Sequence, residues 1–263
     1  MSAESEASKE ASGLRVRLDL GEGPIADLMD IFTQLGVDVI VSTPATQGQH
    51  GMTYYDPKTQ RLVVAVGIVN NAVRHRSNLA HELGHIRFKD FSRDESYSRR
   101  GPNETRAQAF ARHFLFPLSA ARQIVDRWPD PEARMNEAIE RFGVSPTVAA
   151  IQFKAIGALT EEESTRLTSK KTSNWYARRY GWVDKLQSDN AVAQTHQAPR
   201  GLMRRAMIAY QRGLLPIGEL ARWQGMPVSE LEQLLDAEDL VVHPHPDGAV
   251  DFDDEPDELP PLP

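Results

Sequence analysis

Residues 81–85 read His-Glu-Leu-Gly-His, and the interpretation of the whole chain starts from this stretch. On a helix with about 3.6 residues per turn, positions four apart differ in direction by roughly 40°. The imidazoles of His81 and His85 therefore leave one helix face, close enough for both to bind one zinc ion at about 2.0–2.1 Å. Glu82 lies one step round the helix, where its carboxylate reaches a water molecule beside the metal. This arrangement is typical of a hydrolytic zinc site.

The residues around this stretch predict a helix over 72–89 that is buried on one side. An apolar strand precedes it, and its core-facing side is formed by Leu79, Ala80, Leu83 and Ile86. Gly84 in mid-helix costs about 1 kcal/mol relative to alanine. We therefore expect another backbone segment to approach the helix closely at Gly84. The alternative interpretation is two surface histidines on an amphipathic helix.

A catalytic zinc ion needs a third protein ligand and an open fourth position. The candidates that follow in the sequence are Asp90, Asp94, Glu95, Glu104 and His113. We favour Glu104, because Ala107 and Ala111 share its helix face and let this second helix approach the first. A carboxylate at a helix start also suits the helix dipole, although such charges are common there without a metal. Asp90 is a candidate to orient a histidine ligand from behind, whereas His113 points to the opposite face and is expected to be structural or exposed.

The hydrophobic pattern along the chain predicts an α+β fold, with a small antiparallel sheet packed on a mainly helical domain and a small all-helical unit at the C-terminal end. Helices are predicted from Pro24 to 35, over 103–116, over 132–142, from 146 to 156 and from a capping box at Thr160; strands are predicted at 37–41, 52–55 and 62–66. The strand at 62–66 precedes the histidine helix, and as a sheet edge it would be able to pair with an extended peptide.

Changes in composition divide the chain into five parts. A polar lead at 1–12 is predicted to be disordered, and the main domain covers 13–169. Residues 170–199 are interpreted as a linker, although their basic and aromatic residues are also of a kind that stacks on nucleic-acid bases. A helical unit resembling a helix-turn-helix follows at 200–240. The acidic, proline-rich tail at 241–263 is predicted to be disordered.

Composition and charge exclude several classes of protein. The 263 residues include no cysteine, which removes disulfides, thiolate catalysis and cysteine-bound zinc. The net charge of −7 is matched by the seven acidic residues of the tail, so the body is neutral and gives no support for nucleic-acid binding. No apolar run is long enough to span a membrane, and the polar N-terminus is no secretory signal. We therefore expect a cytoplasmic protein without a membrane partner.

Two motifs together carry a family resemblance. The His-Glu-Leu-Gly-His stretch and the pattern Glu104-x-x-Ala107-x-x-Phe110-Ala111, followed by Phe-Leu-Phe-Pro at 114–117, resemble the ImmA/IrrE family of metallopeptidases. The resemblance covers about residues 24 to 160. It implies a gluzincin-like zinc site on a zincin-like fold, with Glu104 as the third ligand. Known members of that family cleave helix-turn-helix transcriptional repressors that govern mobile elements or the DNA-damage response.

The resemblance and the residues together predict a zinc-dependent endopeptidase in which His81, His85 and Glu104 bind the metal and Glu82 is the catalytic base. The metal is Zn²⁺, with Mn²⁺ as an alternative in the cell. The expected partner is a protein substrate such as a transcriptional repressor. One alternative is a peptidase-like protein that sequesters a repressor without cutting it. Another is a DNA-binding regulator that uses the 200–240 unit, although the acidic residues of its last helix oppose contact with phosphate.

Overall fold

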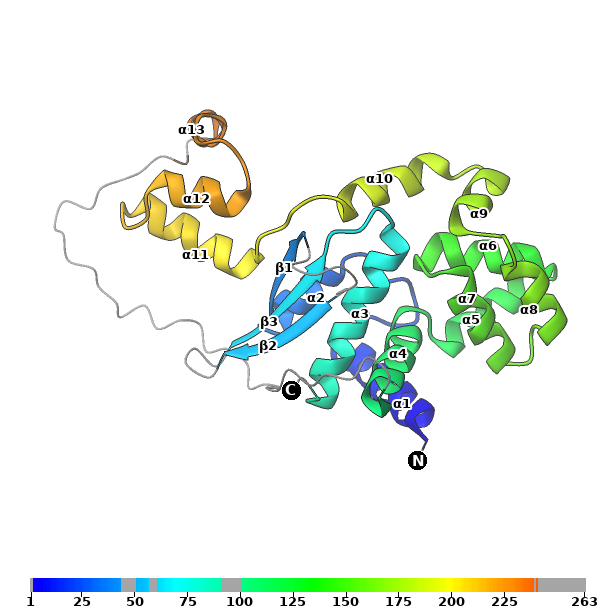
Figure 1. Cartoon of the computed structure of the whole chain (residues 1–263). Helices are drawn as coiled ribbons and strands as arrows, with labels where there is room; N and C mark the ends of the chain where they lie inside the picture. The colour runs from blue at the N-terminus through cyan, green and yellow to red at the C-terminus, as the bar shows by residue number, and fades with distance from the viewer. Residues whose placement is uncertain (1, 44–50, 57–60, 91–100, 239, 241–263) are drawn as a thin grey trace.

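The structure is a computed structural model that describes residues 2–43, 51–56, 61–90, 101–238 and 240. It confirms the α+β class, with a small sheet on one side of a largely helical body (Figure 1). The helices are α1 (Ala3–Arg17), α2 (Leu28–Gln34), α3 (Ala72–Phe88), α4 (Pro102–Leu115), α5 (Leu118–Arg127), α6 (Pro131–Phe142), α7 (Pro146–Ala155), α8 (Glu161–Thr168), α9 (Ser173–Tyr180), α10 (Val183–Ala193), α11 (Arg200–Gln211), α12 (Ile217–Gln224) and α13 (Val228–Ala237).

The sheet is mixed, so the expectation of a purely antiparallel sheet is wrong. Its strands are β1 (Asp38–Ser42), β2 (Gly51–Asp56) and β3 (Arg61–Gly67), in the order β1-β3-β2. β2 pairs with β3 antiparallel as a hairpin, and β1 takes the other edge of β3 in the parallel direction. β3 is therefore the central strand, which contradicts the idea that residues 62–66 form a free edge. The edges of the sheet are β1 and β2.

One face of the sheet packs on α3. Side chains along a strand alternate between its two faces, and the buried set on β3 is Leu62, Val64 and Val66. Val39 and Val41 of β1 are buried in the same core, together with Leu79 and Leu83 of α3. The helix that carries the histidines is therefore held against the hydrophobic face of the sheet.

The predicted disordered lead at 1–12 is wrong, because these residues form most of α1. Ser2 caps the helix with its side chain, and Ala7, Ala11 and Leu14 are buried where α1 packs on α4. The small side chains of Ala7 and Ala11, four residues apart, let the two helices lie close together. The helix expected from Pro24 begins later, at Leu28, where the Asp27 side chain accepts a hydrogen bond from the Met29 backbone.

The expected linker at 170–199 is also wrong, since α9 and α10 occupy most of it and belong to the main core. The buried Tyr176 hydroxyl donates to the Leu167 carbonyl at 2.9 Å, and Trp182 Nε1 donates to Asn136 Oδ1 at 2.8 Å. The capping box at Thr160 is confirmed, with reciprocal hydrogen bonds to Glu163.

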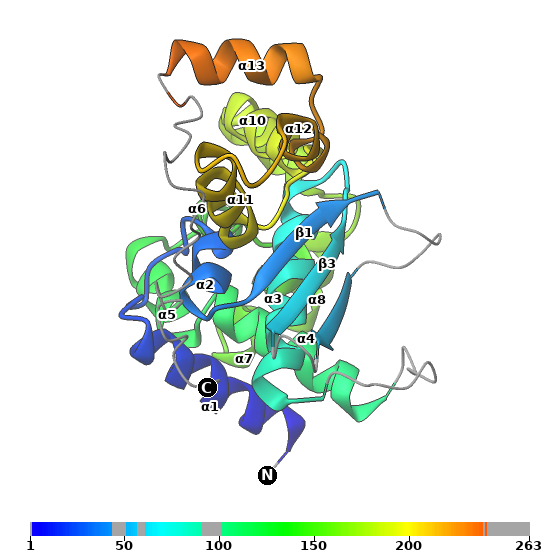
Figure 2. The ribbon, with the colours of Figure 1, turned by 90° about the vertical axis from the view of Figure 1, so that its left-hand side faces the viewer.

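Helices α11, α12 and α13 pack around a second, smaller core beyond β1 (Figure 2). That core is formed by Ala206, Leu220, Ala221, Leu231 and Leu235. Gln197, just before α11, forms an isolated bridge with Val41 of β1, and α11 itself packs on β1. The tail at 241–263 lies outside the described residues. Within the described part of the chain, no helix is long and apolar enough to cross a membrane.

Candidate metal centre

The histidine-bearing helix is defined at both ends by its own sequence. The Asn71 side chain accepts a hydrogen bond from the Arg74 backbone at the N-terminus of α3. At the other end Lys89 adopts a left-handed conformation with φ of 54°, and its N–H bonds to Ile86 while that of Asp90 bonds to His85. This pair of bonds turns the chain back on the helix. The turn brings the Asp90 side chain within reach of His85, one turn earlier on α3.

The second helix, α4, approaches α3 closely at Gly84, as the sequence predicts. A Cβ atom on Gly84 would lie 3.1 Å from Ala107 Cα and 3.2 Å from the Ala107 carbonyl oxygen. Ala107 is fully buried at this contact. Because only glycine opposite alanine leaves this space, the helix backbones come together here and bring Glu104 beside the two histidines.

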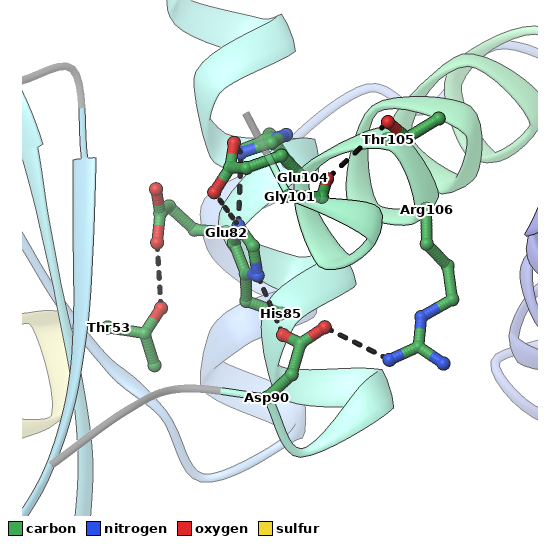
Figure 3. A network of polar contacts seen from close by, with 9 residues as sticks. Thr53, Glu82, His85, Asp90, Gly101, Glu104, Thr105 and Arg106 are labelled. Atoms are coloured by element: carbon green, nitrogen blue, oxygen red, sulfur yellow. Dashed lines mark hydrogen bonds and ion pairs between the residues drawn. The ribbon is translucent and has the colours of Figure 1, made fainter. Parts of the chain in front are cut away.

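The donor atoms of His81, His85 and Glu104 converge in one small space between α3 and α4. Figure 3 shows the His85 and Glu104 side chains pointing toward each other there. The two Nε2 atoms are 3.1 Å apart, and the Glu104 oxygens lie 3.2 Å from His81 Nε2 and 3.3 Å from His85 Nε2. Ligands on a tetrahedral zinc ion at about 2.1 Å are separated by about 3.4 Å. The three donors therefore fit a single divalent cation. Among the described residues, no other cluster of this kind has the required spacing.

Asp90 holds the inner histidine from behind. Its Oδ1 accepts from His85 Nδ1 at 2.7 Å, and its Oδ2 accepts from Arg106 at 3.1 Å. An ionised carboxylate only accepts hydrogen bonds, so the Nδ1 atom of His85 carries the proton and its Nε2 atom faces the metal position. The structure thus places Asp90 where the sequence analysis proposed it.

Glu82 lies between the sheet and the histidine cluster (Figure 3). The Thr53 hydroxyl on β2 donates to Glu82 Oε2 at 2.8 Å, and the residue is 6% exposed. Gly51, also on β2, leaves room for the carboxylate, because a Cβ there would lie 2.7 Å from Glu82 Cδ. Glu82 is therefore a buried carboxylate beside the three donors and not one of them.

Burial and neighbouring charges shift the pKa values of these groups. Burial raises the pKa of Glu82 above its ordinary value. Burial and the nearby His85 lower the pKa of His81. Burial alone would also lower the pKa of His85, but the hydrogen bond and charge of Asp90 outweigh it and raise that pKa. A positive charge on His85 therefore disfavours a second positive charge on His81.

The other candidates have different roles or lie outside the described residues. Asp94 and Glu95 fall within 91–100, which the structure does not describe. His113 is buried on the far side of α4, where its Nε2 lies 2.7 Å from Glu4 of α1 and its Nδ1 lies 3.3 Å from Gln152. This contact fits the structural role expected for His113.

Two arginines of the C-terminal unit pair with aspartates of the main body. Arg200 of α11 pairs with Asp30 and, at 2.8 Å, with Asp27; Arg205 pairs with Asp38 at 3.6 Å. These two arginines are among those that a DNA-binding unit would present to phosphate. Their engagement with aspartates weighs against that use.

Sequence reasoning missed Gly51, Thr53 and Arg106 as neighbours of the site. Gly51 and Thr53 belong to a strand some thirty positions before Glu82, and no local pattern signals their contact. Only its position gives a weak indication that Arg106 lies near the site, because it follows Glu104 by two residues on the same helix. Its contact with Asp90 depends on the turn at Lys89, which is not encoded by the usual glycine.

Comparison with known families adds one match. Residues 32–154 match the family Peptidase_M78, described as the IrrE N-terminal-like domain. The matched segment runs from α2 through the sheet, α3 and α4 to α7, so it includes every residue of the cluster. No curated protein matches the chain.

Proposed function

We propose that the chain is a zinc-dependent endopeptidase, because residues 32–154 match the Peptidase_M78 family, described as the IrrE N-terminal-like domain. The observation that supports this proposal most strongly is the convergence of His81, His85 and Glu104 within 4.8 Å of one another, with the buried Glu82 alongside. A divalent cation held by these three side chains supplies Lewis acidity, which lowers the pKa of water and polarises a carbonyl group.

Proton transfer falls to Glu82. The Glu82 carboxylate accepts the proton of the water that attacks the scissile carbonyl, and it returns this proton to the leaving amine. Thr53 holds one carboxylate oxygen by a hydrogen bond, which leaves the other oxygen to act on water. Burial raises the pKa of Glu82 towards the working range of a general base.

The substrate we propose is a protein, and specifically a helix-turn-helix repressor, as the family resemblance implies. A cleaved segment must be extended to enter the site between two helices and a sheet. β2 is an edge strand and carries Thr53 next to Glu82. An extended segment added to β2 would lie beside the catalytic carboxylate, which replaces the role first given to residues 62–66.

The test is cleavage by the zinc-loaded full chain. We would incubate it with a peptide library and with helix-turn-helix proteins, and identify new termini by mass spectrometry. The Glu82→Gln variant, which keeps the three ligands, should bind zinc like the wild type and lose cleavage by at least about 100-fold. Cleavage by Glu82→Gln at the wild-type rate would exclude Glu82 as the base. Tight binding of a repressor without cleavage by either form would favour the sequestering alternative.

A further inference from the structure

Arg106 lies outside the ligand cluster, yet it contacts the residue that orients one of the ligands. Its Nη2 donates to Asp90 Oδ2 at 3.1 Å, while Asp90 Oδ1 accepts from His85 at 2.7 Å (Figure 3). Both carboxylate oxygens are therefore engaged. The Asp90 side chain is 7% exposed, so water cannot easily replace either bond.

Arg106 is itself fixed from two further directions. Its Nη1 donates to Glu6 Oε1 of α1 at 3.1 Å, and its guanidinium lies 4.2 Å over the ring of Phe88, the last residue of α3. A planar guanidinium suits this position, because it presents N–H donors in two directions while one face stacks on an aromatic ring. Arg106 thus connects α1, the end of α3 and α4.

We propose that Arg106 is a positioning residue of the metal centre, and that Glu6 completes a chain of contacts running through Arg106 and Asp90 to His85. The inference rests on the proposed function, in that it takes His81, His85 and Glu104 to bind a divalent cation. Without Arg106, one oxygen of Asp90 is free and the carboxylate can rotate away from the His85 Nδ1–H. A ligand oriented less firmly binds metal less tightly.

Helix α1 also contributes to the orientation of the metal ligands. α1 precedes the segment that matches the family, which begins at residue 32, yet its Glu6 is the outermost link of the chain. The helix is held by further ion pairs of the same kind, including Glu4 with Arg112 at 2.5 Å and Glu10 with Arg87 at 2.8 Å. α1 is thereby joined to both helices that carry the ligands.

Arg112 provides a matched control. Like Arg106 it lies on α4 and pairs with a glutamate of α1, and the two side chains are similarly exposed, at 15% and 22%. Within the described residues Arg112 pairs with Glu4 and has no contact with Asp90. Removing Arg112 therefore weakens the attachment of α1 without affecting the orientation of His85.

The experiment measures the affinity of the purified full chain for Zn²⁺ by competition with a chromophoric chelator. Arg106→Met should lower the affinity by about tenfold, whereas Arg112→Met should stay within about twofold of wild type. Arg106→Lys, which restores one cationic donor, should recover part of the loss. Thermal unfolding of the metal-free variants would show whether both methionine variants are folded.

A second pair of variants serves if Arg106→Met does not fold. Glu6→Gln and Glu4→Gln alter exposed side chains of α1, and the first should lower zinc affinity by about threefold while the second leaves it unchanged. Equal affinities within both pairs would overturn the role of Arg106. A wild-type chain that binds no Zn²⁺ would overturn the metal centre itself, so the two failures are distinguishable.

Discussion

Gly84 is the position where one added methyl group tests the spacing of the two ligand-bearing helices. Its Cβ would lie 3.1 Å from Ala107 Cα and 3.2 Å from Phe110 Cδ1. Carbon atoms prefer separations of about 3.5–4.0 Å. Because the nearest atom belongs to the backbone of a packed helix, α4 must move by several tenths of an ångström to accept alanine.

Two opposing effects determine how Gly84→Ala changes the free energy of unfolding. Replacing a mid-helix glycine with alanine gains about 1 kcal/mol of helix propensity, and overpacking a close contact costs about 1–3 kcal/mol. We expect overpacking to exceed the gain, so that Gly84→Ala lowers the free energy of unfolding by about 1 kcal/mol and Gly84→Val lowers it by about 3 kcal/mol. Since α4 carries Glu104, Gly84→Val should also reduce zinc affinity by about tenfold.

Urea unfolding of the metal-free protein measures the free energy of unfolding, and competition with a chelator measures the zinc affinity. Gly218→Ala is the control, because that helical glycine in α12 has no atom within 4 Å of an added Cβ. It should raise stability by up to about 1 kcal/mol. If Gly84→Ala stabilised the protein as much as Gly218→Ala and left zinc affinity unchanged, the close approach of α3 and α4 would be refuted.

Three further predictions concern other parts of the chain. Gly51→Ala places a Cβ 2.7 Å from Glu82 Cδ and displaces the carboxylate, so kcat/KM for a cleaved peptide should fall about 100-fold while zinc affinity holds. Lys89 adopts a left-handed backbone conformation, which costs a lysine more than a glycine. Lys89→Gly should therefore raise the free energy of unfolding by about 0.5–1 kcal/mol, as measured in thermal melts. Burial alone would raise the pKa of Glu4, but the hydrogen bonds and charges of Arg112 and His113 together outweigh it and lower that pKa from its ordinary value of 4.5. Wild type should therefore be more stable than Glu4→Gln above pH 4.5, and urea unfolding should show this difference shrinking as the pH falls below that value.

Local spacing was enough to predict the parts of the site that lie on one helix. The four-residue step from His81 to His85 follows from helix geometry alone. Glu104 was predicted because small residues share its face, and the Gly84–Ala107 contact shows why that pattern is informative. These signals lie within single helices, where the sequence period and the structural period coincide.

The errors arose where the structure depends on distant contacts. The helix α1 was missed because its buried face consists mainly of alanines among acidic residues, and its stability comes from packing on α4. The parallel pairing of β1 with β3 differs from the expected antiparallel sheet, because these two strands are neighbours in space although β2 lies between them in the sequence. Thr53 meets Glu82 because β2 pairs with β3 and packs against α3, which no local pattern in the sequence signals.

The hydrogen bond from Trp182 to Asn136 bears on where the chain can be cut. Asn136 lies inside the family segment, which ends at residue 154, whereas Trp182 lies 28 positions beyond that end. A fragment trimmed to the family segment would leave the Asn136 amide oxygen without its donor, at about 1–3 kcal/mol. It would also expose the core once covered by Tyr176 and Leu186. The smallest fragment that keeps this core intact therefore extends through α10, and a protease acting on the native protein should leave α9 and α10 attached to the main body.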